Sequence, residues 1–261
     1  MKKDLLLQFL KLKNELKNKI EELKQKDKIV LENYWNEYLP TKKEYNSAAI
    51  DGSYNYLRYR SLVFYTINIS LVEYRNKQII RKSFPEFDVM EDFMFFEDFL
   101  RTEMIKRELL LAAEKIETSN IMLDGSLISF LTYVPEEIRK SFLEKVETSQ
   151  NFIFSISKTP MKSFSEVNKE GFSKVISHYE KYNIISFYFK LRKNSLIFKV
   201  ETFKKFEDRI EDIISLIRFF EFRGYPYLLK RAHEEAKISN KDIQKFAKLL
   251  GIREKTGREI L

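Results

Sequence analysis

Two short phrases in the sequence repeat one pattern, an apolar run followed by Asp-Gly-Ser. Ile50 precedes Asp51-Gly52-Ser53, and Leu123 precedes Asp124-Gly125-Ser126. In each phrase we expect a short buried strand that ends at the aspartate, where glycine adopts a positive φ and turns the backbone away. Two carboxylates placed side by side repel each other unless one is protonated or a cation lies between them, so the pair predicts a divalent metal site. The alternative is that each Asp-Gly is an ordinary turn, because this dipeptide is common in turns.

A third carboxylate is predicted from the long helix expected between residues 91 and 117. The apolar residues of this helix recur on one face, at Phe96, Leu100, Met104 and Leu111. A step of four residues from Met104 reaches Glu108, and a carboxylate within a buried stripe is costly unless it is paired or bound to a cation. We therefore choose Glu108 as the helix acid. Glu114 is the alternative, because the edge of the stripe is not sharply defined.

The segment from Arg223 to His233 places a turn, two tyrosines and a histidine just before or within a helix. Tyr225 and His233 are the candidates for a site here. A lone histidine is more often a packed or surface residue than a ligand, and we assign His178, which has no motif around it, to that class. The alternative for Tyr225 is a core aromatic residue with a satisfied hydroxyl.

Three basic residues are candidates for binding a nucleic acid. Lys158 ends a strand that alternates apolar and polar residues, where it could meet a phosphate at the same edge as the aspartates. Arg58 and Arg60 alternate with tyrosines in another strand, which could present a basic and aromatic surface. The alternative for all three is an ordinary solvated side chain at a strand end or on a strand face.

The elements that must position these residues follow from hydrophobic periodicity. Residues 1 to about 38 predict an amphipathic helix that ends at Pro40, and residues 46 to 83 predict three strands in an antiparallel meander. The remaining elements are a helix over 91–117, a strand ending at Asp124, a helix from Pro135, a strand over 151–158, a helix over 164–181, a hairpin over 184–203 and helices over 207–222, after 223 and over 240–250. We expect three parts: a helical arm (1–40), an α/β domain (41–250) and a basic tail (251–261).

Composition narrows the class of protein. The 261 residues carry 47 Lys and Arg against 39 Asp and Glu, a formal net charge of +8, which favours polyanionic partners. The sequence has no cysteine, so disulfide frameworks, thiolate zinc sites and cysteine nucleophiles are excluded. No stretch approaches eighteen consecutive apolar residues, and we expect a soluble, cytoplasmic protein.

The order of three strands, helix, strand, helix and strand resembles the ribonuclease H-like fold, a mixed sheet flanked by helices. In that arrangement, acids from the first strand, first helix and fourth strand, with a late Asp or His, converge on two metal ions. Asp51, Glu108, Asp124 and His233 occupy these places in order. Two cations serve phosphodiester hydrolysis by activating water and stabilising the leaving oxygen. Carboxylate oxygens suit Mg²⁺ or Mn²⁺, and an imidazole ligand favours Mn²⁺.

The sequence also resembles the NurA nucleases of archaea and some bacteria. The resemblance is carried by Ile50–Ser53, Leu123–Leu127, Ser157-Lys158-Thr159 and the Gly-Tyr-Pro-Tyr…Ala-His segment that ends at His233, over about residues 46 to 250. It implies Mn²⁺-dependent cleavage of single-stranded DNA and 5′-to-3′ degradation of DNA ends. It also implies a homodimer that works with the hexameric ATPase HerA in DNA end resection during recombinational repair.

The resemblance assigns roles to individual residues. Asp51, Asp124 and His233 would be metal ligands, Glu108 the helix acid, and Tyr225 a further site residue. The assignment of Glu108 as the helix acid has the least support from the resemblance, because no short motif surrounds this residue. Leu228 departs from the pattern, since a second proline is expected there, and this affects the rigidity of the turn more than the chemistry.

Two other functions compete with a nuclease. One is a non-catalytic, basic and aromatic protein that holds nucleic acid or loads another enzyme. The other is a nucleotide hydrolase, but the stretch from Gly251 to Gly257 lacks the Lys-Ser/Thr ending and the preceding strand of a phosphate loop. A serine hydrolase would need a Gly-x-Ser-x-Gly turn, which is absent. Asp51→Asn and Asp124→Asn distinguish the non-catalytic protein from a nuclease, because a nuclease would lose cleavage and a binding protein would keep its activity.

Overall fold

The computed structural model describes residues 3–26, 31–158 and 167–252 of the chain. The strands are β1 (Trp35–Asn36), β2 (Ser47–Tyr59), β3 (Leu62–Arg75), β4 (Gln78–Glu91), β5 (Asn120–Asp124), β6 (Ile153–Ser157), β7 (Gly171–Ser173), β8 (Ser177–Tyr179), β9 (Ile184–Lys190), β10 (Phe198–Phe203), β11 (Glu221–Phe222) and β12 (Tyr225–Pro226). The α-helices are α1 (Lys3–Lys26), α2 (Phe96–Lys115), α3 (Leu127–Tyr133), α4 (Glu136–Thr148), α5 (Ile210–Phe219), α6 (Tyr227–Ala236) and α7 (Asn240–Leu249). Short 3-10 helices are η1 (Leu31–Tyr34), η2 (Glu180–Tyr182) and η3 (Lys204–Arg209).

One mixed sheet organises these elements. Its strand order is β1-β7-β9-β10-β6-β5-β2-β3-β4, with β8 paired to β9. The central pairs β2–β5 and β5–β6 are parallel, and the other pairs are antiparallel. The middle residues of β5, Ile121, Met122 and Leu123, are fully buried, as expected for a parallel strand covered on both faces.

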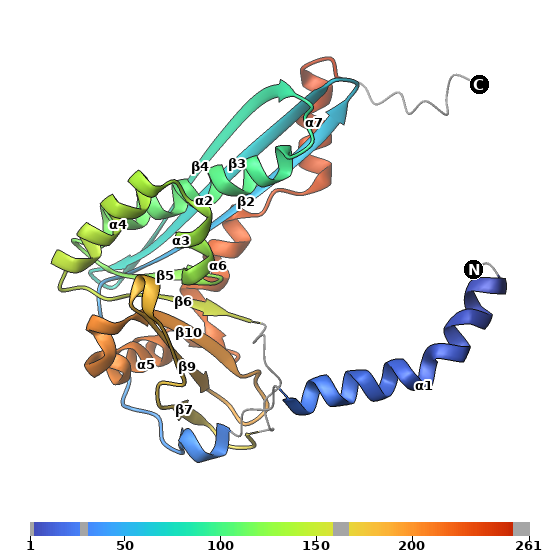
Figure 1. Ribbon diagram of the computed structural model, residues 1–261. Coiled ribbons are helices and arrows are strands. Elements are labelled where there is room, and N and C mark those ends of the chain that lie inside the picture. Colours follow the sequence, from blue (N-terminus) through green and yellow to red (C-terminus); the bar gives the residue numbers. More distant parts are fainter. Residues whose placement is uncertain (1–2, 27–30, 159–166, 253–261) are drawn as a thin grey trace.

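Helices cover both faces of the sheet (Figure 1). Tyr56 of β2 donates to Glu97 of α2 on one face. On the other face, Ser53 of β2 and Ser70 of β3 donate to main-chain carbonyls of α6. Because side chains alternate along a strand, α2 with α3 and α4 forms one layer, and α5, α6 and α7 form the other. The strands β2, β3 and β4 extend beyond the central sheet, where α7 packs against them.

The α/β class with a mixed sheet and flanking helices is confirmed, and so is most of the element order. The Asp124 strand, the 184–203 hairpin and the last helix lie where they are expected, and the meander is present but continues past the expected end at residue 83 to Glu91. The helix predicted over 164–181 is wrong, because the described part of that range contains β7, β8 and η2. The first helix ends at Lys26 rather than near residue 38, since η1 and β1 follow before Pro40.

The helix α1 stands apart from the rest of the molecule in Figure 1. Its apolar side chains are exposed, including Leu6, Phe9, Leu12, Leu16 and Ile20. The expected arm over residues 1–40 therefore has a helical part that ends at Lys26, and the expected tail from residue 253 lies outside the described residues. None of the described helices is both long and apolar enough to cross a membrane.

Candidate metal centre

Asp51 and Asp124 meet because their strands run parallel and side by side. Ile50 of β2 is aligned with Leu123 of β5, so the next residue on each strand is an aspartate. The side chain of His233 reaches them from α6. One ligand atom from each of the three residues lies within 4.8 Å of the others, and His233 Nδ1 is 2.9 Å from Asp51 Oδ2. Two carboxylates and an imidazole from distant parts of the sequence therefore form one cluster.

The backbone at the two Asp-Gly phrases differs from the expectation in one case. Gly125 has a φ of +128°, and β5 ends at Asp124 as predicted. The expected turn at Gly52 is wrong, because β2 continues without a break to Tyr59 and Gly52 has no positive φ. Asp51 therefore projects from the middle of a long strand. The glycine after it has another role, which involves Glu108.

Glu108 approaches β2 from the face opposite Asp51, at the space that Gly52 leaves open. A Cβ atom at residue 52 would lie 2.9 Å from Glu108 Oε1 and 2.8 Å from Met104 Cγ. Glu108 is 1% exposed, and its Oε2 has no hydrogen-bond partner among the described residues. A buried carboxylate oxygen without a partner is rare in a folded protein, and a bound ion or water molecule would account for it. The alternative acid, Glu114, is exposed and pairs with Lys115.

Burial and mutual repulsion raise the pKa values of the acids. The pKa of Asp51 rises from 3.8 to about 6, first because burial disfavours the charged form and then because Asp124 is close. His233 opposes this rise. The pKa of Glu108 is raised well above its ordinary value, again by burial first and by Asp51 next, while the Gly52 N–H opposes the shift. The centre thus concentrates negative charge that a bound cation would stabilise.

Lys158 and Tyr225 lie next to Asp124. Lys158 Nζ is 2.8 Å from Asp124 Oδ2 and 5.0 Å from the centre of the Tyr225 ring. The Tyr225 hydroxyl is enclosed and has no well-formed hydrogen bond within the described ranges. Burial raises the pKa of this hydroxyl, and the carboxylates of Asp124 and Asp51 raise it further. Tyr225 therefore keeps its proton at neutral pH.

Main-chain contacts fix the segment that carries Tyr225 and His233. Gly224 has a φ of +84° in the β11–β12 turn, and its N–H donates to Glu221 Oε1 at 2.7 Å. Tyr227 N–H, at the start of α6, donates to Phe220 O at 2.7 Å. Leu228, where a proline was expected, is fully buried. Apolar packing thus holds this position at the start of α6.

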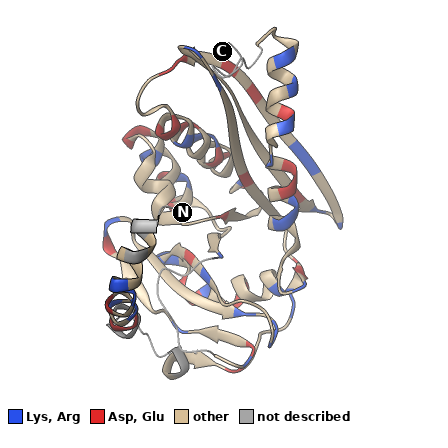
Figure 2. Cartoon of the chain, turned by 90° about the vertical axis from the view of Figure 1, so that its right-hand side faces the viewer, with Lys and Arg blue, Asp and Glu red and all other residues tan. Residues whose placement is uncertain are grey.

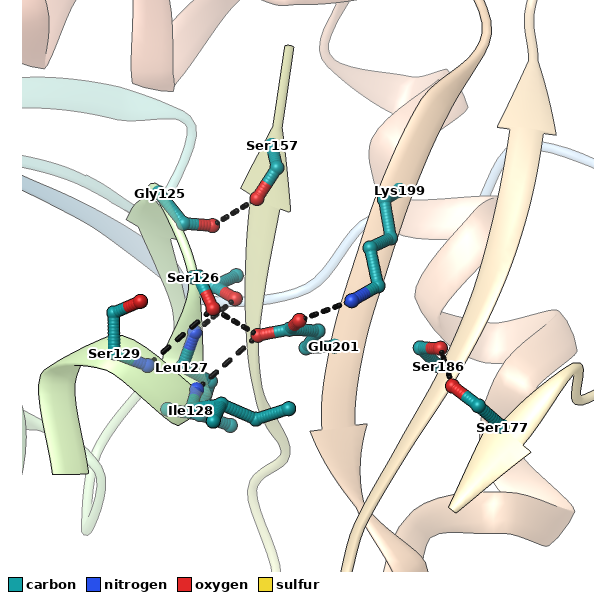
Figure 3. Close-up of polar contacts among 11 residues, drawn as sticks. Gly125, Ser126, Leu127, Ile128, Ser129, Ser157, Ser177, Ser186, Lys199 and Glu201 are labelled. Carbon is teal, nitrogen blue, oxygen red and sulfur yellow. Dashed lines mark hydrogen bonds and ion pairs between the residues drawn. The ribbon is translucent and has the colours of Figure 1, made fainter. Parts of the chain in front are cut away.

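A buried carboxylate that the sequence did not single out holds the turn after Asp124 (Figure 3). Glu201 of β10 is 1% exposed, and its Oε2 accepts hydrogen bonds from Ser126 Oγ at 2.8 Å and from Ile128 N–H at 3.2 Å. Lys199 Nζ pairs with its other oxygen at 2.5 Å. Ser157 Oγ also donates to Gly125 O at 2.6 Å. In the sequence, the indication of such a role for Glu201 is that a charged residue stands inside the apolar strand over 198–203.

Arg58 and Arg60 are not brought to the centre. They lie seven and nine residues beyond Asp51 on or after β2, so Arg58 is about 23 Å away along an extended strand. Arg58 covers the Phe96 ring at 4.4 Å and pairs with Asp92, and Arg60 lies over Tyr59. His178 is exposed, near Asn183, as expected of a surface residue.

The donor set fits a hard or borderline divalent cation. Asp51, Asp124 and His233 offer carboxylate oxygens and one imidazole, which suit Mn²⁺ and Mg²⁺ ligation. Buried Glu108 adds an unpartnered carboxylate oxygen on the other side of β2. A hydrogen bond from His233 Nδ1–H to the Asp51 carboxylate leaves Nε2 with its lone pair free.

Comparison with known proteins gives a consistent result over most of the chain. A family model described as the NurA domain matches residues 46–149 and 137–238. The DNA double-strand break repair nuclease NurA of Sulfurisphaera tokodaii is 37% identical over 70 residues, which cover 27% of this chain and 20% of that protein. The probable DNA double-strand break repair nuclease NurA of Methanocaldococcus jannaschii is 24% identical over 344 residues, which cover 94% of this chain and 87% of that protein.

Solved structures share the fold. The crystal structure of the NurA nuclease from Sulfolobus solfataricus matches with a TM-score of 0.73 at 20% identity, over 96% of this chain and 97% of that one. A crystal structure of NurA with manganese matches with a TM-score of 0.67 at 12% identity, over 95% and 99% of the two chains. These matches confirm the predicted ribonuclease H-like α/β fold.

Proposed function

The chain belongs to the NurA family, and from that premise we propose that it is a metal-dependent nuclease that hydrolyses phosphodiester bonds of DNA. The observation that carries the proposal is the cluster of Asp51, Asp124 and His233, whose ligand atoms lie within 4.8 Å of one another. The buried, unpartnered Glu108 oxygen beside this cluster supports it. The names of the curated relatives and the manganese in a solved NurA structure point the same way.

Mn²⁺ is the proposed cofactor, with Mg²⁺ as the alternative, in a two-metal site. Asp51, Asp124, Glu108 and His233 are the proposed ligands. Bound cations would polarise the scissile phosphate and lower the pKa of a water molecule that attacks it. The acids have to be ionised to bind a cation, so the raised pKa values of Asp51 and Glu108 predict weaker metal binding in mild acid.

Lys158 and Tyr225 are proposed to act on the substrate phosphate. Lys158 carries a positive charge at the edge of the centre, where it now pairs with Asp124. Tyr225 retains its hydroxyl proton and can donate a hydrogen bond to a phosphate oxygen. Arg58 and Arg60 lie far along β2, and we propose that they contact DNA outside the centre.

The finer activities are proposed from the family resemblance. We propose single-strand endonuclease and 5′-to-3′ exonuclease activity in the end resection of double-strand breaks, with a HerA-type hexameric ATPase and a homodimeric nuclease. The exposed apolar side chains of α1 offer one surface for such protein contacts. We also propose that the protein acts in the cytoplasm, where the genomic DNA of a prokaryote lies.

The test is cleavage of end-labelled single-stranded DNA with Mn²⁺, in parallel with DNA binding. We expect Asp51→Asn and Asp124→Asn to reduce cleavage by at least a hundredfold while DNA binding is kept, because each variant removes a ligand charge without changing the shape of the side chain. Asp208→Asn is the matched control, since Asp208 is exposed on η3, away from the cluster.

Full cleavage by both active-centre variants would exclude this centre as the nuclease site. If the wild type binds DNA but does not cleave it with either metal, the protein is the non-catalytic nucleic-acid-binding module instead. The Asp208→Asn protein has to match the wild type in both assays.

A further inference from the structure

The strand β4 forms one edge of the ten-stranded sheet. It pairs with β3 along its whole length, from the Arg75–Gln78 pair to the Leu62–Glu91 pair. On its other side, no strand of the described residues lies against it, and nearly every residue of β4 is exposed. A long exposed edge pairs readily with another strand, and proteins usually shorten, bend or cover such edges.

The register of β4 determines which residues point their main-chain groups outward. Asp92, just after β4, donates its N–H to Ser61 O at 2.8 Å. Since hydrogen-bonded pairs alternate along an antiparallel ladder, the even-numbered residues of β4 bond to β3. The outward groups belong to the odd-numbered residues: Ile79, Arg81, Ser83, Pro85, Phe87 and Val89. Pro85, which has no N–H, falls in the outward row, where an edge strand tolerates proline.

Apolar side chains are exposed on both faces of this edge. They are Ile79, Ile80, Phe84, Phe87 and Val89. Phe84 is 45% exposed and lines a hollow of about 360 Å³ against α2, together with Arg107. Phe87 lines a second hollow, of about 250 Å³, with Phe246 of α7 on the other face. Exposed apolar residues on both faces of an unpaired edge indicate an interaction surface.

The charges of β4 are arranged so that the strand complements a reversed copy of itself. Its basic residues, Arg81 and Lys82, lie in the first half, and its acidic residues, Glu86, Asp88 and Glu91, lie in the second half (blue and red in Figure 2). An antiparallel copy places the basic half opposite the acidic half. A parallel copy would place like charges together. A self-complementary patch of this kind suits a two-fold symmetric contact.

We propose that β4 pairs in antiparallel orientation with β4 of a second copy of this chain, across a two-fold axis at Phe84. This register sets Lys82 opposite Glu86 of the second copy, and Phe84 opposite itself. It also sets Ile79 opposite Val89, whose N–H is already bonded to Asp88 Oδ1 at 2.8 Å, so the ladder ends there.

Other registers fit the strand less well. Only a register that pairs odd-numbered residues with odd-numbered ones keeps the main-chain hydrogen bonds. Centring the axis one residue later would set the apolar Phe84 opposite Glu86, and Ile79 opposite Glu91. Glu86 contacts Arg107 of its own chain, but a carboxylate has acceptor sites for a second cation.

The contact would join two sheets into one and leave both metal centres open. Asp51 lies on β2, which β3 separates from the edge strand. This pairing rests on the homodimer of the proposed function. It adds the surface through which the two chains meet, which is β4, and the register in which the two strands pair. Its failure is distinguishable from failure of the nuclease proposal, because its test needs no cleavage.

Because the chain has no cysteine, one introduced thiol tests the register directly. In a non-hydrogen-bonded antiparallel pair the Cα atoms are about 4.5 Å apart, within reach of a disulfide. We expect oxidised Phe84→Cys protein to run as a covalent dimer on a non-reducing gel. Ile80→Cys is the matched control: its exposure is similar, at 40% against 45%, but it would face Asp88 of the second copy. It should remain a single chain.

Sedimentation equilibrium at micromolar concentration gives the second measurement. We expect a dimer for the wild type and at least a tenfold weaker dimer for Phe84→Asp, which places two carboxylates on the axis. Leu196→Asp, at another exposed apolar position between β9 and β10, should leave the dimer unchanged. A dimer that Phe84→Asp leaves intact and Phe84→Cys does not cross-link would overturn the β4 surface alone. A monomeric wild type would overturn the homodimer as well.

Discussion

The backbone of Gly52 and the carboxylate of Glu108 share one small space, since a Cβ atom at residue 52 would lie 2.9 Å from Glu108 Oε1. We expect Gly52→Ala to destabilise the protein by about 1–3 kcal/mol through overcrowding. It should also weaken Mn²⁺ binding, because Glu108 has to move. Urea unfolding and isothermal titration with Mn²⁺ measure the two effects.

The matched comparison is the same substitution in a Glu108→Ala background. There the clash with the carboxylate is gone, although Met104 and Ile69 still lie within 3 Å of the added atom. Gly52→Ala should therefore cost less stability and have no further effect on Mn²⁺ binding. Equal costs in the two backgrounds would show that Glu108 does not determine the need for glycine.

The raised pKa of Asp51 makes the metal-free protein sensitive to pH. Its folded-state value of about 6 lies above the ordinary 3.8, so the folded protein holds this proton more tightly than the unfolded chain. The tighter proton binding at Asp51 therefore adds to the free energy of unfolding below pH 4, and this contribution is lost as the pH rises through 6. A two-unit shift corresponds to on the order of 2–3 kcal/mol. Asp51→Asn removes the ionisation and should be more stable than the wild type at pH 7.5 but not at pH 4.

Thermal unfolding in the presence of a chelator measures this difference. Added Mn²⁺ should raise the wild-type Tm at pH 7.5 and have little effect on Asp51→Asn, since the variant has lost a ligand charge. The prediction is wrong if the difference in Tm between the two proteins is the same at both pH values.

Glu201 should affect metal binding without touching the metal. Glu201→Ala leaves Ser126 Oγ, Ile128 N–H and Lys199 without their buried acceptor, at a cost of about 1–3 kcal/mol. Because these contacts hold the turn after Asp124, Mn²⁺ binding should weaken severalfold. Glu201→Gln keeps one acceptor oxygen and should recover part of the affinity.

Ser186→Ala is the control for that experiment. It removes the partly buried hydrogen bond between Ser177 and Ser186, which lies in the same sheet but does not touch the Asp124 turn. Its Mn²⁺ affinity should equal that of the wild type. If Glu201→Ala binds Mn²⁺ as the wild type does, the carboxylate serves only the packing of β10.

Lys158 should contribute to DNA affinity and not to metal affinity. Lys158→Gln removes one charge near the substrate, so the slope of log K against log salt for single-stranded DNA should become shallower by about 0.7. The Asp124 oxygen that Lys158 now occupies becomes free, so Mn²⁺ binding should not weaken. Fluorescence anisotropy over a salt series measures the slope. Lys140→Gln, at an exposed lysine paired with Glu136 on α4, should leave it unchanged.

The cluster of Asp51, Asp124 and His233 was predicted from the two Asp-Gly-Ser phrases, the order of elements and the family resemblance of the segment that ends at His233. Each follows an apolar strand or stands in a distinctive segment, and the order of elements limited how they could be assembled. The role of Gly52 could not be found in this way, because the space it leaves open exists only once α2 packs across β2. The continuation of β2 past Asp51 was missed for a related reason: its pairing with β3 outweighs the local preference of Asp-Gly for a turn.

The role of Glu201 and the strands β7 and β8 could not be predicted from sequence patterns. Glu201 interrupts an apolar strand, but only the tertiary fold shows that it meets the helix that begins at Leu127. The 164–181 segment has helix-like spacing, yet β7 and β8 of this region pair with β9 instead. Long-range pairing determined these elements, and periodicity does not report it.

The proposed ligands of the centre are far apart in sequence, with His233 182 residues after Asp51. During synthesis, a growing chain that has reached β5 already carries three acids, but it lacks the imidazole and Tyr225. The centre therefore cannot be completed until α6 has left the ribosome and folded back over β2. A partly synthesised chain that ends before α6 therefore lacks the complete proposed cation site.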